Sequence, residues 1–179
     1  LIVGPLSNFG EYLKNKQDIL INKAVMQGGF CPYSNHHYKC VRLEKFENKY
    51  IVPSFNPNGN SRGFNNFLTA NITDRKMVGK NVCHTVSLHK NQLKNFNTPK
   101  NKAGKLFVEA LELLSNKQEY KKIHDMVAAV CFVKPEYGKW IRGKSFKTKE
   151  GCGTNIDPSG DDILVDIDYD KMWEEIYSI

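Results

Sequence analysis

A continuous apolar stretch, residues 126–133, constrains the fold more than any other feature of the sequence. It contains β-branched valines and no charged residue, which is typical of a central strand buried on both faces of a sheet. Amphipathic helices are expected before it, over 103–118, and at the end of the chain, over 169–177. Alternating helices and strands predict an α/β protein with three α/β/α layers and a central mixed sheet of about five strands.

The rest of the pattern completes this expected architecture. Asp168 or Asp170 is suited to the N-terminus of the last helix. A chain of 179 residues predicts a single domain over 1–179, and no apolar run is long enough to span a membrane. The other expected elements are helices over 7–27 and 82–96, strands over 38–43, 50–55, 67–72 and 163–167, and a loop over 56–66.

Charge is distributed unevenly along the chain. The net charge is +7, from 26 basic and 19 acidic residues. Residues 157–179, the acidic C-terminal strand and helix, carry a net charge of −7, against +14 for the preceding residues. A basic body attracts polyanions, which makes RNA or single-stranded nucleic acid a possible partner. A solvated lysine-rich surface is the alternative, and the acidic end could neutralise the body or form a second interface.

The five cysteines are widely spaced and odd in number, which favours reduced thiols and an intracellular protein of unspecified compartment. His36 lies within the densest group of possible metal ligands, but the spacing matches no common zinc pattern. No cofactor is therefore expected, with zinc as the alternative. The weak metal candidates are Cys31, His37, Cys40 and Cys83.

Two motifs resemble the cytidine deaminase family. Residues 31–35, Cys-Pro-Tyr-Ser-Asn, follow the first expected helix as in that family, and residues 71–74, Asn-Ile-Thr-Asp, resemble its nucleoside-contacting motif. The resemblance implies a deaminase-like α/β/α fold and self-association, so protein partners or a homo-oligomer are expected. It also implies a nucleoside pocket formed by Tyr33, Asn71, Thr73 and Cys83.

The deaminase catalytic motifs are incomplete. Thr85 replaces the acid/base glutamate two residues after Cys83, and residues 135–139 lack both cysteines of the second zinc motif. A hydroxyl cannot replace a carboxylate as acid/base, and one thiolate cannot hold a catalytic zinc. The leading expectation is a pseudoenzyme, a non-catalytic nucleic-acid-binding or scaffold protein. The alternative is a zinc-dependent nucleoside or nucleotide deaminase-type hydrolase with atypical ligands, for which Cys83, His84 and Cys152 are candidates.

Residues 134–149 interleave basic and aromatic side chains. Basic groups bind phosphates and aromatic rings stack on bases, so this stretch is a candidate single-strand contact. The alternative is an exposed loop whose rings pack on the core. The candidate contacts are Lys134, Lys139, Trp140, Arg142, Lys144 and Lys147.

Residues 150–153, Glu-Gly-Cys-Gly, resemble the nucleophile turn of viral chymotrypsin-like cysteine proteases. Cys152 would attack and a histidine would activate it. That fold requires about a dozen strands, which the expected helices contradict, so a cysteine protease is a second alternative. The candidate bases are His36, His37, His84, His89 and His124.

Overall fold

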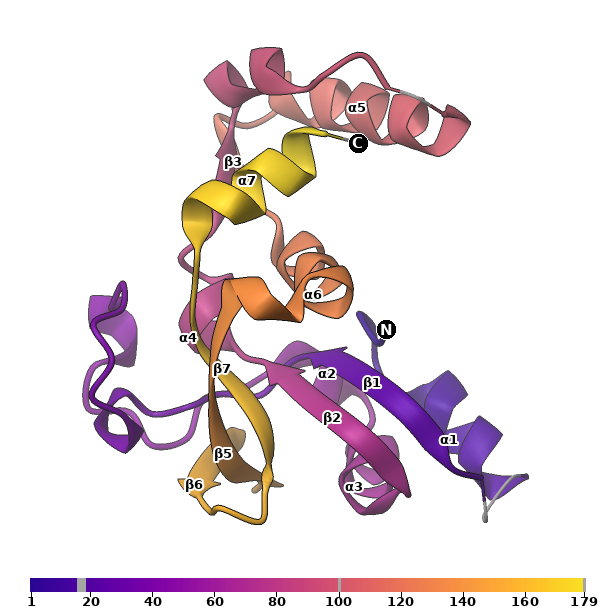
Figure 1. Ribbon diagram of the computed structural model, residues 1–179, viewed down its shortest axis with the longest axis vertical. Coiled ribbons are helices and arrows are strands. Elements are labelled where there is room, and N and C mark those ends of the chain that lie inside the picture. Colours follow the sequence, from indigo (N-terminus) through magenta and orange to yellow (C-terminus); the bar gives the residue numbers. More distant parts are fainter. Residues whose placement is uncertain (16–18, 100, 179) are drawn as a thin grey trace.

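The computed structural model describes residues 1–15, 19–99 and 101–178. A five-stranded mixed sheet forms its centre, in the order β1-β2-β7-β5-β6 (Figure 1). Strands β1, β2 and β7 are parallel, whereas β5 is antiparallel to both of its neighbours. The strands are β1 (Ile21–Gln27), β2 (Ile72–Val78), β5 (Gly138–Lys147), β6 (Cys152–Ile156) and β7 (Asp161–Ile167), and a separate antiparallel pair is β3 (Ser87–His89) with β4 (Tyr120–Lys122).

Helices cover both faces of the sheet. Alternate β1 side chains enter two cores: Met26 packs with residues of α1 and α3, and Val25 packs with residues of α4, α6 and α7. The coarse prediction of three layers around a mixed five-stranded sheet is confirmed. The helices are α1 (Ser7–Lys14), α2 (Phe55–Gly59), α3 (Ser61–Thr69), α4 (Lys80–Cys83), α5 (Lys102–Ser115), α6 (His124–Val133) and α7 (Tyr169–Tyr177), with short 3-10 turns η1 (Tyr33–Asn35), η2 (Glu44–Phe46), η3 (Lys90–Asn95) and η4 (Pro135–Tyr137).

The apolar run predicted as a central strand is instead helix α6. Val127, Ala128, Val130 and Cys131 are buried against β1, β2, α4 and α7. A helix that is enclosed by neighbours on most sides becomes apolar around most of its circumference, so its sequence resembles that of a buried strand. The strand prediction is therefore wrong, although the burial that it implied is correct.

The predicted helix over 7–27 is correct only in its first half. Helix α1 ends at Lys14, residues 16–18 lie outside the described residues, and the second half is β1. β1 hydrogen-bonds in parallel to β2 along its length and buries residues 24–27. Pairing with β2 therefore overrides the helical spacing of the apolar residues.

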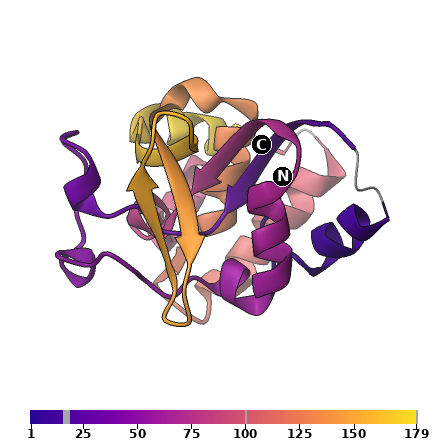
Figure 2. The same cartoon turned by 90° about the horizontal axis from the view of Figure 1, so that it is seen from below.

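The segment between β1 and α2 extends away from the sheet (Figures 1 and 2). The strands predicted over 38–43 and 50–55 are absent there among the described residues, apart from one bridge between Val52 and Cys152. The predicted loop over 56–66 instead forms most of α2 and α3, where the Asn60 side chain accepts a hydrogen bond from the Gly63 N–H at 2.7 Å. Because α3 continues to Thr69, the strand predicted over 67–72 begins later, as β2.

The helix predicted over 82–96 divides into the end of α4, β3 and η3. Three other predictions are confirmed: the helix over 103–118 is α5, the strand over 163–167 lies in β7, and the closing helix is α7. Asp168 caps α7 by accepting from the Lys171 N–H at 3.2 Å. None of the helices in the described residues combines the length and the apolar character that a membrane span requires.

Candidate active site

Two glycines end β1 and allow a later segment to dock at the carboxyl end of the sheet. Gly28 and Gly29 have φ angles of +149° and +83°, which side chains rarely permit. A Cβ on Gly28 would lie 2.9 Å from the Cδ atom of Pro57. The Gly29 N–H donates to the Ser54 hydroxyl at 3.0 Å. The glycine turn therefore fixes residues 54–57 beside the last residue of β1.

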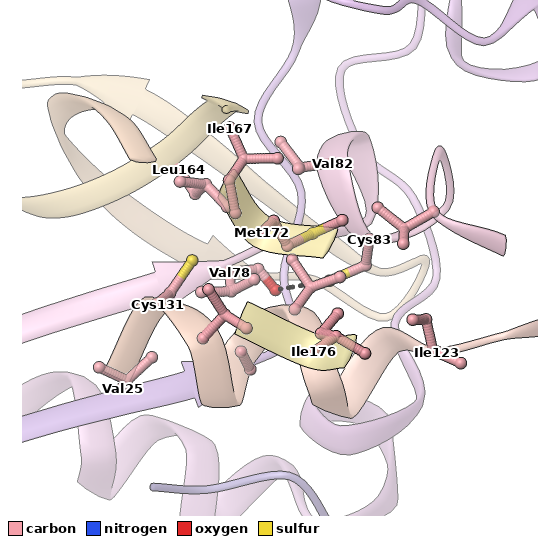
Figure 3. Packing of buried hydrophobic residues seen from close by; sticks show 14 of the residues in the cluster. Val25, Val78, Val82, Cys83, Ile123, Cys131, Leu164, Ile167, Met172 and Ile176 are labelled. Atoms are coloured by element: carbon pink, nitrogen blue, oxygen red, sulfur yellow. Dashed lines mark hydrogen bonds between the residues drawn. The ribbon is translucent and has the colours of Figure 1, made fainter. Parts of the chain in front are cut away.

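A series of buried, hydrogen-bonded polar side chains starts at this docked segment. The Asn56 side chain, 4% exposed, donates to the Gln27 backbone carbonyl at 2.9 Å and to its Oε1 at 2.7 Å. The Cys83 thiol donates to the Val78 carbonyl at 3.6 Å (Figure 3) and to the His124 carbonyl at 3.8 Å. Burial raises the pKa of Cys83 to about 12, although a hydrogen bond with Gln27 lowers it. Cys83 is therefore a neutral thiol that connects β1, β2 and α6.

Two stacked imidazoles lie at the end of this series of polar side chains. The His84 and His124 rings are parallel to within 17°, with centroids 4.6 Å apart. The Lys45 ammonium lies 2.9 Å from His84 Nδ1, and the Phe46 ring packs edge-on against the same imidazole. Segment 44–46 therefore folds back over the stacked pair.

Both imidazoles are neutral at physiological pH. Burial, reinforced by His124 and Lys45, lowers the pKa of His84 to about 3. Burial and nearby lysines, Lys122 first among them, also lower the pKa of His124. The His124 Nε2 atom is buried and has no hydrogen-bond partner within the described residues. A neutral imidazole with an unengaged nitrogen is a group suited to moving a proton.

Helix α6 adds a carboxyl group whose charge acts on Cys83. Asp125 follows His124 in the first helical turn, and burial raises its pKa above the usual range. No ion pair joins Asp125 to another of the described side chains. Amides, an imidazole and a carboxyl group at one sheet end can bind a hydroxyl-rich ligand and transfer a proton.

The structure does not bring the four predicted nucleoside-pocket residues together. Tyr33 and Cys83 lie after the carboxyl ends of β1 and β2, and the Tyr33 hydroxyl accepts from the Leu43 N–H at 3.0 Å. Asn71 and Thr73 lie at the opposite end of β2 and are exposed. Two of the four residues that the deaminase resemblance implies therefore lie at the opposite end of β2 from the other two.

The cysteine and histidine metal candidates also remain apart. Throughout residues 1–15, 19–99 and 101–178, no three His, Cys, Asp or Glu residues are grouped so that they could hold a metal ion. Burial raises the pKa of Cys31 and Cys83 to about 12, and it raises that of Cys40 as well. His37 is exposed, and His36 is buried with neither ring nitrogen paired within the described part of the chain.

Cys152 is buried at the first position of β6, where it pairs with Val52. Burial raises its pKa to about 11, which keeps the thiol protonated at neutral pH. A protonated, inaccessible thiol is a poor nucleophile. The protease alternative is therefore wrong at its central residue as well as in its fold.

The basic and aromatic stretch is strand β5 rather than an exposed loop. Its cations pair with the acidic C-terminal residues: Lys139 with Asp166 at 2.9 Å, Arg142 with Asp162 at 3.0 Å and Lys144 with Asp157 at 2.7 Å. The Trp140 Nε1 donates to the Pro135 carbonyl at 2.8 Å, and Lys147 donates to the Thr148 carbonyl at 2.9 Å. Contact of these residues and of Lys134 with nucleic acid stays a prediction.

Comparison with known proteins identifies the fold. No protein-family model matches the sequence, and no curated protein matches it significantly. Solved structures of nucleoside hydrolases match 98% of the chain: a plant nucleoside hydrolase has a TM-score of 0.71 at 18% identity, and an inosine-guanosine nucleoside hydrolase has 0.69 at 16%. A purine-preferring ribonucleoside hydrolase from Gardnerella vaginalis has 0.68 at 16%. The chain spans 57–60% of these three proteins.

These matches define a nucleoside hydrolase-like fold and overturn the resemblance to cytidine deaminases. The solved structures named here are enzymes, which contradicts the expectation of a non-catalytic nucleic-acid-binding or scaffold protein. None of them is a zinc-dependent deaminase or a cysteine protease. The function of the chain therefore has to be inferred from a hydrolase fold and from the polar groups at its sheet end.

Sequence reasoning missed most of the residues that form this site. Cys83 and His84 were candidates for a zinc hydrolase, and His124 only as a protease base. Asp125 and Asn56 were not singled out, because 126–133 was interpreted as a strand and 56–66 as a loop. The signal that could have found them is His124-Asp125 directly before an apolar run, which also fits the first turn of a buried helix.

Proposed function

We propose that the chain belongs to an enzyme that hydrolyses the N-glycosidic bond of a ribonucleoside, and that the sheet end around His124 forms part of its active site. The observation that supports this proposal is the match of nearly the whole chain to nucleoside hydrolases, among them an inosine-uridine preferring enzyme from Bacillus anthracis. Ligands of open α/β sheets bind at the carboxyl ends of the strands, where Asn56, Gln27 and His124 lie.

The reaction breaks the bond between C1′ and the base nitrogen and forms a bond from C1′ to a water oxygen. The water loses a proton and the departing base gains one. His124, with its unpartnered Nε2, would take up the proton that the water loses and pass it to the departing base, which returns the ring to its neutral form. The amides of Asn56 and Gln27 help to position His124, because Gln27 hydrogen-bonds with Cys83 and the Cys83 thiol donates to the His124 carbonyl.

Replacing His124 tests the proposal directly. The purified chain should release free base and ribose from inosine, guanosine or uridine, measured by chromatography and a reducing-sugar assay. His124→Ala should lower kcat by about 100-fold or more, the usual contribution of a general acid or base. His37→Ala removes an exposed histidine away from the pair and should leave the rate unchanged.

The proposal fails if the folded chain cleaves none of these nucleosides, or if His124→Ala and His37→Ala have equal rates. Circular dichroism of both variants checks that neither substitution unfolds the protein.

A further inference from the structure

Three lysines from separate segments converge on the stacked histidines. Lys45 comes from η2, Lys80 starts α4 and Lys122 ends β4. The Lys122 ammonium donates to the His84 carbonyl and to the Ser87 hydroxyl, both at 2.7 Å, while Lys45 lies beside the His84 ring. The charge of Lys45 acts on both Lys80 and Lys122, and that of all three acts on both imidazoles. Lys45 and Lys122 therefore contact His84 directly, and the charge of Lys80 reaches the same two imidazoles.

Within residues 1–15, 19–99 and 101–178, no carboxylate forms an ion pair with these lysines. In the described part of the chain, Lys45, Lys80 and Lys122 form no ion pair, and Lys122 donates only to neutral oxygens. Burial and the neighbouring Lys45 lower the pKa of Lys80 and of Lys122, so holding these charges together costs free energy. Lys45 is exposed, but Lys80 and Lys122 are half-buried cations without a carboxylate partner among the described residues, which is unusual in a folded protein.

Cations elsewhere on the sheet are arranged differently. Arg75, whose side chain is 10% exposed, pairs with Asp161 at 2.9 Å. Lys76, exposed to the same extent, pairs with Asp74 at 2.6 Å and Asp162 at 2.7 Å. Arg75 and Lys76 therefore have carboxylate partners, whereas no ion pair in the described part of the chain involves the lysines beside His84.

We propose that Lys45, Lys80 and Lys122 bind the phosphate group of the ligand, so that the site takes a nucleoside monophosphate rather than an uncharged nucleoside. A phosphate supplies the missing negative charge and has enough oxygens to accept from several ammonium groups at once. The neighbouring His84 ring is neutral, and the nitrogen that does not face Lys45 can also donate to a phosphate oxygen. This inference rests on the proposed hydrolase site for its substrate class but not for the binding of phosphate.

Calorimetric titration separates the two proposals, because binding requires no turnover. Inorganic phosphate, ribose 5-phosphate, inosine and inosine 5′-monophosphate are each titrated into the wild-type chain. The matched variants replace three lysines by methionine: Lys45, Lys80 and Lys122 in one, and the exposed Lys90, Lys94 and Lys117 in the control. Both variants lose the same charge, so general electrostatic attraction affects them equally.

We expect the monophosphate to bind at least 10-fold more tightly than inosine, since a hydrogen bond between charged groups contributes about that factor. The cluster variant should lose this preference, and the control variant should keep it.

Equal binding of inosine and its monophosphate, or equal affinities of the two variants for phosphate, overturns the inference even if inosine is hydrolysed. Tight, cluster-dependent phosphate binding without hydrolysis of either compound supports the phosphate site and refutes the hydrolase. Binding of inorganic phosphate and ribose 5-phosphate without any monophosphate binding overturns the nucleotide as ligand.

Discussion

At the scale of single residues, the neutral state of His84 depends on its surroundings. Burial contributes most to the low pKa of about 3, and Lys45 adds to it by placing a positive charge 2.9 Å from Nδ1. Removing that charge favours the protonated ring, so Lys45→Met should raise the pKa of His84 part of the way toward about 6.5. The remaining burial should keep it below that value. Chemical shifts of the ring carbons followed against pH measure the change.

Lys144→Met is the control for this titration, since Lys144 pairs with Asp157 in the β5–β6 hairpin. An unchanged His84 titration in Lys45→Met would show that Lys45 does not contact the ring in solution. Equal shifts in both variants would mean that net charge alone sets the pKa of His84.

At the scale of elements, the crossing of α1 and α3 depends on Gly63. A Cβ at this position would lie 2.5 Å from the Leu6 backbone oxygen, which cannot move aside as a flexible side chain would. Gly63→Ala should therefore lower the free energy of unfolding by about 1–3 kcal/mol, the usual cost of overpacking. Gly4→Ala is the matched control, because a Cβ there meets no atom within 4 Å. Urea unfolding of both variants measures the difference, and equal midpoints would refute the tight crossing.

The sequence predicts elements best where one face is exposed. Helices α5 and α7 have a polar face, so the spacing of their apolar residues reveals the helical period. Helix α6 is enclosed by neighbours, and a short apolar run of this kind fits either a helix or a strand. Asn60 shows a third limit: a residue typical of loops also caps a helix, and here it begins α3. The site was missed for these reasons, because α6 and α2 carry much of it.

At the scale of the whole molecule, the uneven charge of the sequence is partly neutralised within the fold. Strand β7 carries much of the acidic C-terminal charge and lies between β2 and β5, which both present cations to it. Asp162 pairs with Lys76 and Arg142, and Asp161 pairs with Arg75. Of the two roles considered for the acidic end, neutralisation within the chain is the one that these ion pairs support.

This arrangement predicts loss of stability in acid in two stages. The pKa values of His84 and His124 are lower in the folded protein, so unfolding takes up protons and stability decreases as the pH falls below about 6.5. Burial raises the pKa of Asp162, but hydrogen bonds from Lys76 and Arg142 outweigh it and lower the pKa overall. The stability from Asp162 is therefore fully present above about pH 4 and disappears as the carboxylate becomes protonated at lower pH.

Asp162→Asn should reduce the second stage and leave the first unchanged, while Asp157 and Asp168, whose pKa values are also lowered, keep the rest of the second stage. It should also lower the free energy of unfolding at pH 7 by about 1–3 kcal/mol, because it leaves Lys76 and Arg142 without this partner. Urea unfolding at a series of pH values measures both effects. Glu174→Gln removes one exposed carboxylate from α7 and serves as the control, which should retain both stages. A stability profile for Asp162→Asn that runs parallel to that of the wild type below pH 4 would contradict this role of Asp162. The proton uptake on unfolding would then be unchanged by the loss of Asp162, which would show that other carboxylates hold the acidic end to the basic body.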